Sequence, residues 1–91
     1  MLMLAQIDLS HANLSLFEES EATVLALLGK YGARLEERLR STDGQAELHL
    51  LYFPDAASLA AFRGDPERAS VQGVWARSGA ASTLTEVTRL A

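Results

Sequence analysis

The residues best able to do chemistry in this chain lie on either side of one predicted turn. Arg38 and Arg40 precede the dipeptide Asp43-Gly44, and Glu47 and His49 follow it. An Asp-Gly pair between two alternating runs predicts a β-hairpin whose two turn residues have positive φ. With that dipeptide at the turn centre, Arg40 faces Glu47 and Arg38 faces His49. The hairpin therefore gathers one imidazole, two guanidinium groups and a carboxylate on one side.

This cluster predicts either an acid–base site or a structural charge network. His49 is suited to act as a general base or to orient a substrate, because imidazole titrates near neutral pH. Arg38 would hold an anionic group and Glu47 would tune the imidazole, so these three are the candidate catalytic residues. Glu36, on the same side of the hairpin, is a candidate ligand-binding residue. In the structural alternative, Arg40 and Glu47 form an ordinary cross-strand ion pair within a solvated or interfacial network.

Composition excludes several kinds of partner and cofactor. The formal net charge is -4 and no run of Lys or Arg occurs, so neither nucleic acid nor a membrane surface is an expected partner. The absence of cysteine excludes thiolate zinc sites, iron–sulfur clusters and cysteine nucleophiles. Asp8 and His11 are spaced like metal ligands, but without further ligands they predict no metal site. No nucleotide-binding or zinc-protease motif is present, so we expect no cofactor.

Size and hydropathy indicate one domain over residues 1–91. Apolar residues make up 48% of the chain, which is enough for one core. Since so small a domain buries a limited share of its surface, a partner subunit would add stability.

No run approaches the roughly 18 apolar residues of a membrane span, and the first ten residues lack the positive region of a signal peptide. We expect a cytoplasmic protein, and the excess of Arg over Lys with abundant Ala indicates a GC-rich bacterial genome.

The elements that would position the cluster follow a βαββαβ order. Hydrophobic periodicity and turn signals predict strand 1–9, helix 15–31, strands 34–41 and 46–53, helix 56–63, a weaker helix from residue 66, and strand 83–90. This order is typical of an α+β, ferredoxin-like domain, in which a four-stranded antiparallel sheet carries its helices on one face. Right-handed crossovers place the first and third strands at the centre of the sheet.

Helix boundaries are indicated by capping residues. Ser15 and Glu18 fit a capping box at the start of the first helix. Asp55 is suited to cap the second helix, and Asp65-Pro66-Glu67 to open the third. The third helix carries Trp75, which we expect in the core or in a pocket wall and take as a candidate ligand-binding residue.

The face of the sheet without helices is predicted to form a dimer interface. Four apolar side chains are assigned to this face, namely Leu2, Leu4, Leu51 and Phe53. Burying each against a partner would contribute about 1.5–3 kcal/mol before association costs. Scattered surface apolar residues are the alternative explanation. We expect a homodimer.

Two segments carry a resemblance to a known family. The segment Lys30-Tyr31-Gly32, which ends the first helix, and the run FPDAASLAAFRGDPERA at 53–69 resemble the dimeric α/β-barrel superfamily. The resemblance is greatest to its small uncharacterised bacterial members and its antibiotic-biosynthesis-monooxygenase-like branch. It implies that two subunits pack sheet to sheet around a barrel whose interior is the ligand pocket. It does not fix one activity, because the superfamily holds many.

One branch of that superfamily degrades haem, and this chain departs from its pattern. Haem-degrading members pair an Asn on the first strand with a Trp and a His on the later helical segment. Here the first strand offers Gln6, and Trp75 is followed by no His. The resemblance therefore does not imply haem degradation, and Gln6 is retained as a candidate ligand-binding residue.

Three functions remain open from the sequence. The first is a small homodimer that binds a small organic ligand in the barrel interior. The second is a cofactor-independent monooxygenase or isomerase acting on a small aromatic or polyketide-like substrate. The third is a purely structural or regulatory dimerisation domain whose interior is filled by side chains. A cavity of about 300 Å³ or more with His49 on its wall would favour the first two.

Overall fold

The computed structural model describes residues 1–91. Its elements, in chain order, are β1 (Leu2–Asp8), α1 (Leu14–Ala26), the 3₁₀ helix η1 (Leu28–Tyr31), β2 (Arg34–Arg40), β3 (Ala46–Tyr52), α2 (Ala56–Arg63), α3 (Pro66–Ser70), α4 (Gln72–Ser78) and β4 (Ala81–Val87). None of these helices combines the length and the hydrophobicity needed to cross a membrane.

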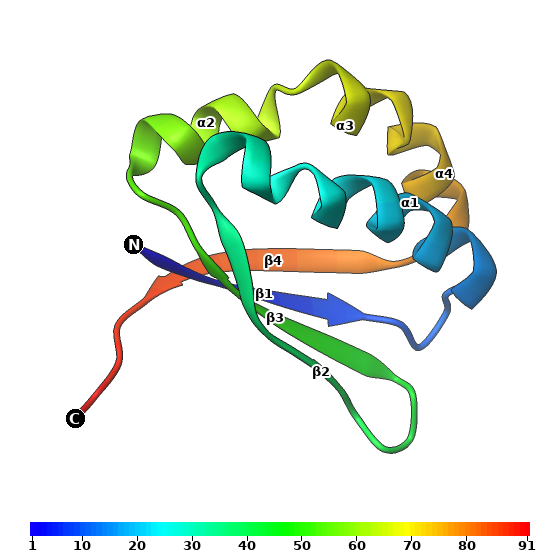
Figure 1. The fold of residues 1–91 in the computed structure, drawn as a ribbon. Helices are drawn as coiled ribbons and strands as arrows, with labels where there is room; N and C mark the ends of the chain where they lie inside the picture. Colours follow the sequence, from blue (N-terminus) through cyan, green and yellow to red (C-terminus); the bar gives the residue numbers. More distant parts are fainter.

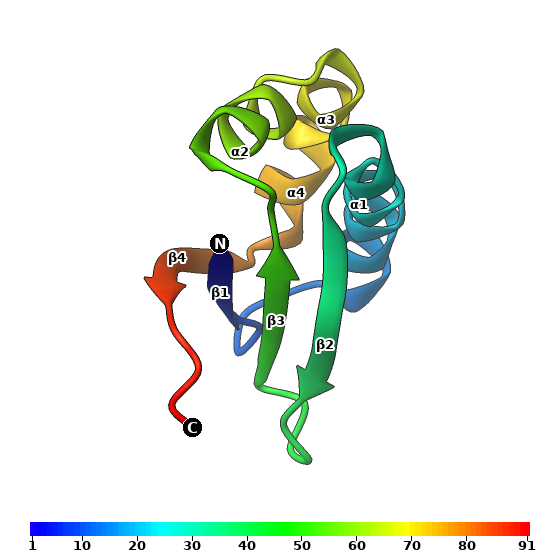
Figure 2. The same cartoon turned by 60° about the vertical axis from the view of Figure 1, so that its left-hand side comes forward.

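The predicted ferredoxin-like fold is confirmed. The strands form one antiparallel sheet in the order β2-β3-β1-β4, with β1 and β3 at the centre. All helices cover the same face of this sheet, and the other face is left open (Figures 1 and 2). Because β3 is central, the side chains that it directs toward the helices lie in the middle of the molecule.

The hairpin register is confirmed near the turn, although the turn itself differs from the prediction. Arg40 pairs with Glu47 and Arg38 pairs with His49. The predicted two-residue turn is wrong, because residues 42–45 form a four-residue loop between Ser41 and Ala46. Within this loop only Gly44 has a positive φ, of 76°. A four-residue loop has the same centre as a two-residue turn at Asp43-Gly44, so the pairing of the strands is unchanged.

Farther from the turn, a β-bulge shifts the pairing of β2. Continuing the register of Arg38 with His49 along the hairpin predicts that Leu35 faces Tyr52. This prediction is wrong, since Leu35 pairs with Leu51 and Arg34 pairs with Tyr52. The irregularity lies between Leu35 and Glu37. An extra residue in one strand moves the following side chains to the other face. Leu35 therefore lies on the helix-covered face and packs against the core.

The first helix begins and ends earlier than predicted. Asn13, rather than Ser15, is the N-cap, and its side chain accepts a hydrogen bond from the Leu16 amide at 3.1 Å. The helix ends at Ala26 and continues as η1. The chain then turns at Gly32, where φ is 68°. Asn is as good an N-cap as Ser, and a start at Asn13 moves the capping box out of position.

The two aspartate caps of the later helices are confirmed. Asp55 accepts a hydrogen bond from the Ser58 amide at 2.7 Å, and Asp65 accepts one from the Glu67 amide at 2.8 Å. The predicted third helix divides at Val71 into α3 and α4. This division places Arg68 and Trp75 on separate short helices above the sheet.

The assignment of Leu51 and Phe53 to the open face is wrong. Both side chains are buried in the core between the sheet and the helices, and Phe53 is fully enclosed. Alternation along β3 places them on the same face as Glu47 and His49. The pairing of β3 with β1 joins this face to that of Met3, which the helices cover. The polar face of the hairpin is therefore the covered one.

The open face carries a different set of apolar side chains. Leu2 and Leu4 lie on it as predicted, opposite Tyr52 and Leu50. The exposed or half-buried apolar residues of this face are Leu2, Leu4, Leu39, Leu48, Leu50, Tyr52 and Val87. The central strands β1 and β3 contribute Leu2, Leu4, Leu48 and Leu50, so the open face is apolar at its centre. Leu39 on the edge strand β2 is 55% exposed and Leu48 is 36% exposed.

Candidate functional site

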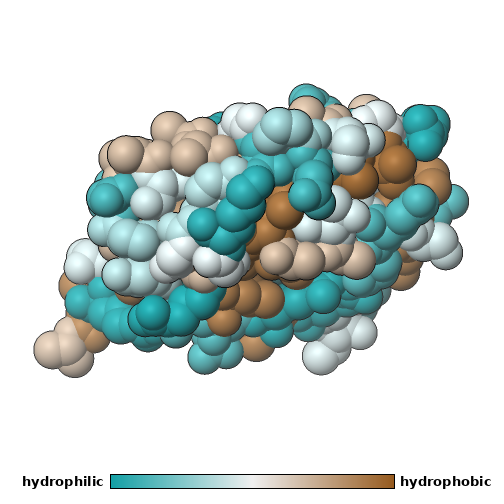
Figure 3. Space-filling model, turned by 45° about the horizontal axis from the view of Figure 1, so that its top comes forward, coloured by the Kyte–Doolittle hydropathy of each residue, from teal (hydrophilic) through white to brown (hydrophobic).

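A cavity of about 290 Å³ lies between the sheet and the helices, with His49 in its wall. Its apolar walls come from every layer of the molecule: Ala5, Ile7, Val24, Leu25, Leu28, Leu51, Phe53, Leu59, Phe62, Val71, Trp75 and Leu84. Seen from the helical side, apolar side chains are visible in a hollow between polar ones near the middle of the molecule (Figure 3). The cavity lies within a single chain, whereas the resemblance implied a pocket inside a barrel formed by two chains.

His49 is held in the floor of the cavity by Glu47. Both side chains are buried, and His49 Nε2 lies 2.5 Å from Glu47 Oε2. They lie two residues apart on β3, so alternation places both on the helix side of the sheet. A carboxylate hydrogen-bonded to one ring nitrogen fixes the orientation of the imidazole and leaves the other nitrogen free for chemistry.

Two arginines hold Glu47 in its ionised form. Arg38 donates to Glu47 Oε2 at 3.0 Å and Arg40 to Oε1 at 2.7 Å. Burial disfavours the charge of Glu47, but the hydrogen bonds from His49, Arg40 and Arg38 outweigh it and keep the pKa of Glu47 below its usual value. Both arginines also contact Glu18 on α1. Two guanidinium groups and two carboxylates thus balance one another beside the cavity.

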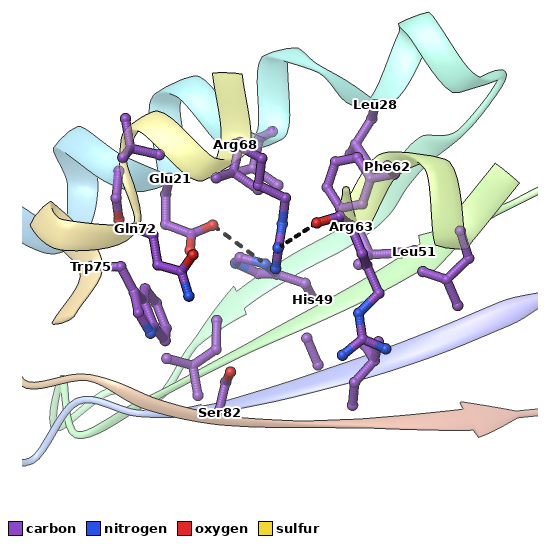
Figure 4. Close-up of a pocket in the computed structure, with 18 of the residues that line it drawn as sticks. Glu21, Leu28, His49, Leu51, Phe62, Arg63, Arg68, Gln72, Trp75 and Ser82 are labelled. Atoms are coloured by element: carbon purple, nitrogen blue, oxygen red, sulfur yellow. Dashed lines mark hydrogen bonds and ion pairs between the residues drawn. The ribbon is translucent and has the colours of Figure 1, made fainter. Parts of the chain in front are cut away.

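A second carboxyl group faces His49 from the helical layer. Glu21 on α1 is buried and lines the cavity, and its Oε2 lies 3.9 Å from His49 Nδ1 (Figure 4). Burial, reinforced by the nearby negative charge of Glu47, raises the pKa of Glu21 to about 7. Glu21 therefore exchanges a proton near neutral pH at the side of the imidazole away from Glu47.

Two arginines from α2 and α3 complete the polar part of the wall. In Figure 4 the Arg68 side chain points down toward His49, and Arg63 points toward the strands. Arg68 donates from Nη1 to the Arg63 carbonyl oxygen at 3.2 Å. Burial and the neighbouring charge of Arg63 lower the pKa of Arg68. Gln72 and Ser82 add neutral polar groups to the wall.

The arrangement is suited to binding an apolar molecule and moving one proton on it. Most of the wall is apolar, while His49, Glu21 and Arg68 converge on one region of it. A small number of polar groups within an apolar pocket is the usual composition of a small-molecule site. Among these groups, the imidazole of His49 and the carboxyl group of Glu21 are of the types that act as general acids and bases.

The candidate residues from the sequence divide into two groups. His49, Glu47 and Arg38 lie together as predicted, and Trp75 lines the same cavity. Gln6 is exposed on the open face, on the opposite side of β1 from the cavity. Glu36 forms an ion pair with Arg34 at 2.8 Å and does not line the cavity.

The sequence prediction missed the contribution of the helices. No functional role was predicted from the sequence for Glu21, Arg63 or Arg68. The available signal was position: Glu21 lies four residues after Phe17 and three before Val24, on the apolar stripe of α1. A charge on such a stripe is a reason to expect a buried functional group.

Comparison with known proteins adds evidence about the fold. No protein-family model and no curated protein sequence matches this chain. SnoaB, a cofactor-independent oxygenase from Streptomyces nogalater, matches with a TM-score of 0.69 at 12% identity, over 98% of this chain and 94% of SnoaB. A dimeric ferredoxin-like protein of unknown function from Jannaschia matches with a TM-score of 0.68 at 18% identity, over 96% of this chain and 100% of that one. A candidate antibiotic biosynthesis monooxygenase from Caulobacter crescentus matches with a TM-score of 0.71 at 15% identity, over 97% of this chain and 89% of that one.

This chain has the ferredoxin-like fold of these proteins. The matches extend over nearly the whole of each chain, which agrees with the superfamily that the sequence resembles. At such low identity the likeness establishes the fold alone, and function has to be argued from the site.

Proposed function

We propose that this protein is a homodimer that binds a small, largely apolar organic molecule in the cavity between sheet and helices. The observation that carries the proposal is the cavity of about 290 Å³ with twelve apolar residues in its wall and His49 beside them. Small-molecule pockets measure about 300–1,000 Å³, so the cavity suits a small ligand of up to three fused rings. The dimer rests on the apolar open face and on the Jannaschia relative, which is described as dimeric. The cytoplasmic location expected from the sequence belongs to the same proposal.

The cavity also bears on the purely structural alternative. A dimerisation domain without a ligand has no need of an unfilled interior, because voids in a core are destabilising by loss of packing contacts. The cavity therefore favours the binding function over the structural one.

The binding function is tested with a neutral two-ring probe, 2-naphthamide. The chain has a single tryptophan, and Trp75 lines the cavity, so its indole N–H signal in an NMR spectrum reports on this site alone. We expect saturable shifts of that signal, with one probe bound per subunit. Ser82→Phe places a ring in the cavity from β4 and should abolish the shifts. Thr88→Phe, at an exposed position beyond β4, should leave them unchanged. Absence of binding to the unmodified protein would contradict the proposal.

A second candidate is a cofactor-independent oxygenase or isomerase acting on a small aromatic or polyketide-like substrate. The specific observation is the hydrogen bond from His49 Nε2 to Glu47, which leaves Nδ1 available toward Glu21 and the cavity. His49 would remove a proton from an acidic carbon or hydroxyl of the substrate. SnoaB, which shares the fold, is described as a cofactor-independent oxygenase.

The chemistry of this candidate is testable with anthrone and dissolved oxygen. Loss of a methylene proton gives an electron-rich anthrone anion, which reduces O₂; one oxygen atom enters the ring carbon and the other leaves in water, so that anthraquinone forms. We expect His49→Gln to lower the rate by about 10²-fold or more. His11→Gln, at the exposed histidine, should retain full activity. An unchanged rate in His49→Gln would contradict the role of His49.

A further inference from the structure

The wall of the cavity carries two positive charges that form no ion pair with any carboxylate of the chain. Neither Arg63 nor Arg68 forms an ion pair. The one hydrogen bond of the Arg68 guanidinium goes to the Arg63 carbonyl oxygen, and its Nε is buried without a partner. A buried donor of a charged group is costly to leave without an acceptor. The site therefore lacks one acceptor.

The acidic residues nearby do not supply that acceptor. Glu18 and Glu47 are bound by Arg38 and Arg40, so these four charges sum to zero. Glu21 remains, and it lies beyond ion-pair distance of Arg68. Its pKa of about 7 leaves it part-protonated at neutral pH. The cavity wall consequently carries an excess of positive charge.

We infer that the ligand of the cavity is a small apolar carboxylic acid, and that Arg68 binds its carboxylate with added positive charge from Arg63. The inference deepens the proposed function and rests on it. A guanidinium presents its N–H groups in a planar fork that matches the two oxygens of a carboxylate. In Arg68 the Nη1 group donates to the Arg63 carbonyl, whereas Nε is buried and makes no hydrogen bond.

The position of Arg68 allows the rest of such a ligand to be buried. Its guanidinium lies 5.6 Å from the centre of the Phe62 ring, which supports the planar group from one side. In Figure 4 Arg68 descends toward His49 from the helices, with Leu51 and Trp75 to either side. A carboxylate at Arg68 would place an attached ring among the apolar walls and next to the imidazole.

The test compares two probes of equal shape, 2-naphthoate and the neutral 2-naphthamide, by isothermal titration and by the Trp75 indole signal. We expect the unmodified protein to bind 2-naphthoate at least about tenfold more tightly than 2-naphthamide. Arg68→Gln should remove this difference, because it should weaken the binding of 2-naphthoate far more than that of 2-naphthamide. Arg68→Lys keeps the positive charge but lacks the planar N–H groups of the guanidinium, and it should retain part of the difference in affinity between the two probes. Arg77→Gln, at an exposed position on α4, should bind both probes like the unmodified protein.

The outcomes separate the inference from the function on which it rests. Equal affinity of the unmodified protein for the two probes would overturn the inference and leave the binding function in place. Failure of both probes to bind would contradict the binding function and the inference with it. If Arg68→Gln does not fold, the inference is still tested by the affinities of the unmodified protein and of Arg68→Lys for the two probes. A preference for 2-naphthoate that persists in Arg68→Lys and Arg68→Gln alike would overturn the role of Arg68.

Discussion

At the scale of single residues, two buried glutamates near one histidine differ in their acidity for identifiable reasons. Glu47 receives hydrogen bonds from Arg38, Arg40 and His49, which hold its pKa low against the effect of burial. Glu21 is buried without a cation at contact distance, and its pKa is raised to about 7. Environment rather than residue type decides which carboxyl group keeps its proton. His49 therefore lies between an ionised carboxylate and a carboxyl group that titrates near neutrality.

The raised pKa of Glu21 predicts a specific dependence of stability on pH. The folded protein binds this proton more tightly than the unfolded chain, whose pKa is near 4.5. Its stabilising effect is therefore complete below about pH 4.5 and is lost as the pH rises through 7. The loss amounts to about 3 kcal/mol. Glu21→Gln, which cannot ionise, should be more stable than the unmodified protein at pH 8 by about this amount and similar to it at pH 4.5, as measured by urea denaturation.

The control for this prediction is Glu19→Gln, which alters an exposed carboxylate of the same helix. Its free energy of unfolding should differ little from that of the unmodified protein at both pH values. If Glu21→Gln shows no gain at pH 8 relative to pH 4.5, Glu21 is not buried as a neutral acid, and its assignment to the cavity wall is wrong.

At the scale of elements, the two segments that carry the family resemblance contact each other. Lys30 and Tyr31 of η1 both bind the carboxylate of Asp65, and the Lys30 Nζ lies 2.8 Å from Oδ2. Asp65 is buried and also caps α3 through the Glu67 amide. These contacts hold the pKa of Asp65 far below its usual value, the hydrogen bonds from Lys30 and Tyr31 being the main cause. One side chain thus joins the end of the first helical unit to the start of the helix that carries Arg68.

Asp65→Ala should loosen the helical side of the cavity. It removes the cap of α3 and leaves Lys30 and Tyr31 without their acceptor, so the start of α3 loses its attachment to η1. We expect a fall in Tm and faster amide hydrogen exchange over residues 66–78. Asp55→Ala removes only the cap of α2 and serves as the matched control, with a smaller fall in Tm and unchanged exchange over 66–78. Equal effects of the two variants would show that the contacts with Lys30 and Tyr31 add nothing to capping.

At the scale of the whole molecule, the helices protect one face of the sheet and leave the other apolar face open (Figure 2). Leu39 and Leu48 pair across β2 and β3 on that open face and are both well exposed. In a symmetric dimer both copies of each such residue are buried in the interface. Because full burial of a leucine contributes about 1.5–3 kcal/mol, a few of them suffice to hold two copies together.

Leu48→Glu should therefore weaken the dimer by at least about 100-fold in Kd. The measurement is sedimentation equilibrium at micromolar protein concentration. Leu90→Glu adds the same charge at a leucine that is 89% exposed beyond β4, and it should leave association unchanged. A monomeric unmodified protein would contradict the dimer proposal outright, whereas an unaffected Leu48→Glu dimer would exclude the open face as its interface.

Much of the fold could be predicted from local sequence signals. The order of elements, the caps at Asp55 and Asp65 and the pairing of Arg38 with His49 all depend on residues close together in the chain. The central position of β1 and β3 follows from that order and the right-handed crossover rule. The errors arose where two local solutions compete, as with Asn13 and Ser15 at the start of α1. The bulge near Glu36 also has no local signal, because an extra residue is decided by the packing of both strands.

The sequence by itself determined which residues of β3, and of the part of β2 near the turn, share a face, because side chains alternate along a regular strand. It could not determine which of the two faces the helices cover, and so Leu51 and Phe53 were assigned to the wrong side. That choice depends on the pairing of β3 with β1 and on how the distant helices pack. Tertiary structure alone brought Glu21, Arg68 and Trp75 to His49, since these residues come from three helices and are separated from His49 by 19 to 28 positions in the chain.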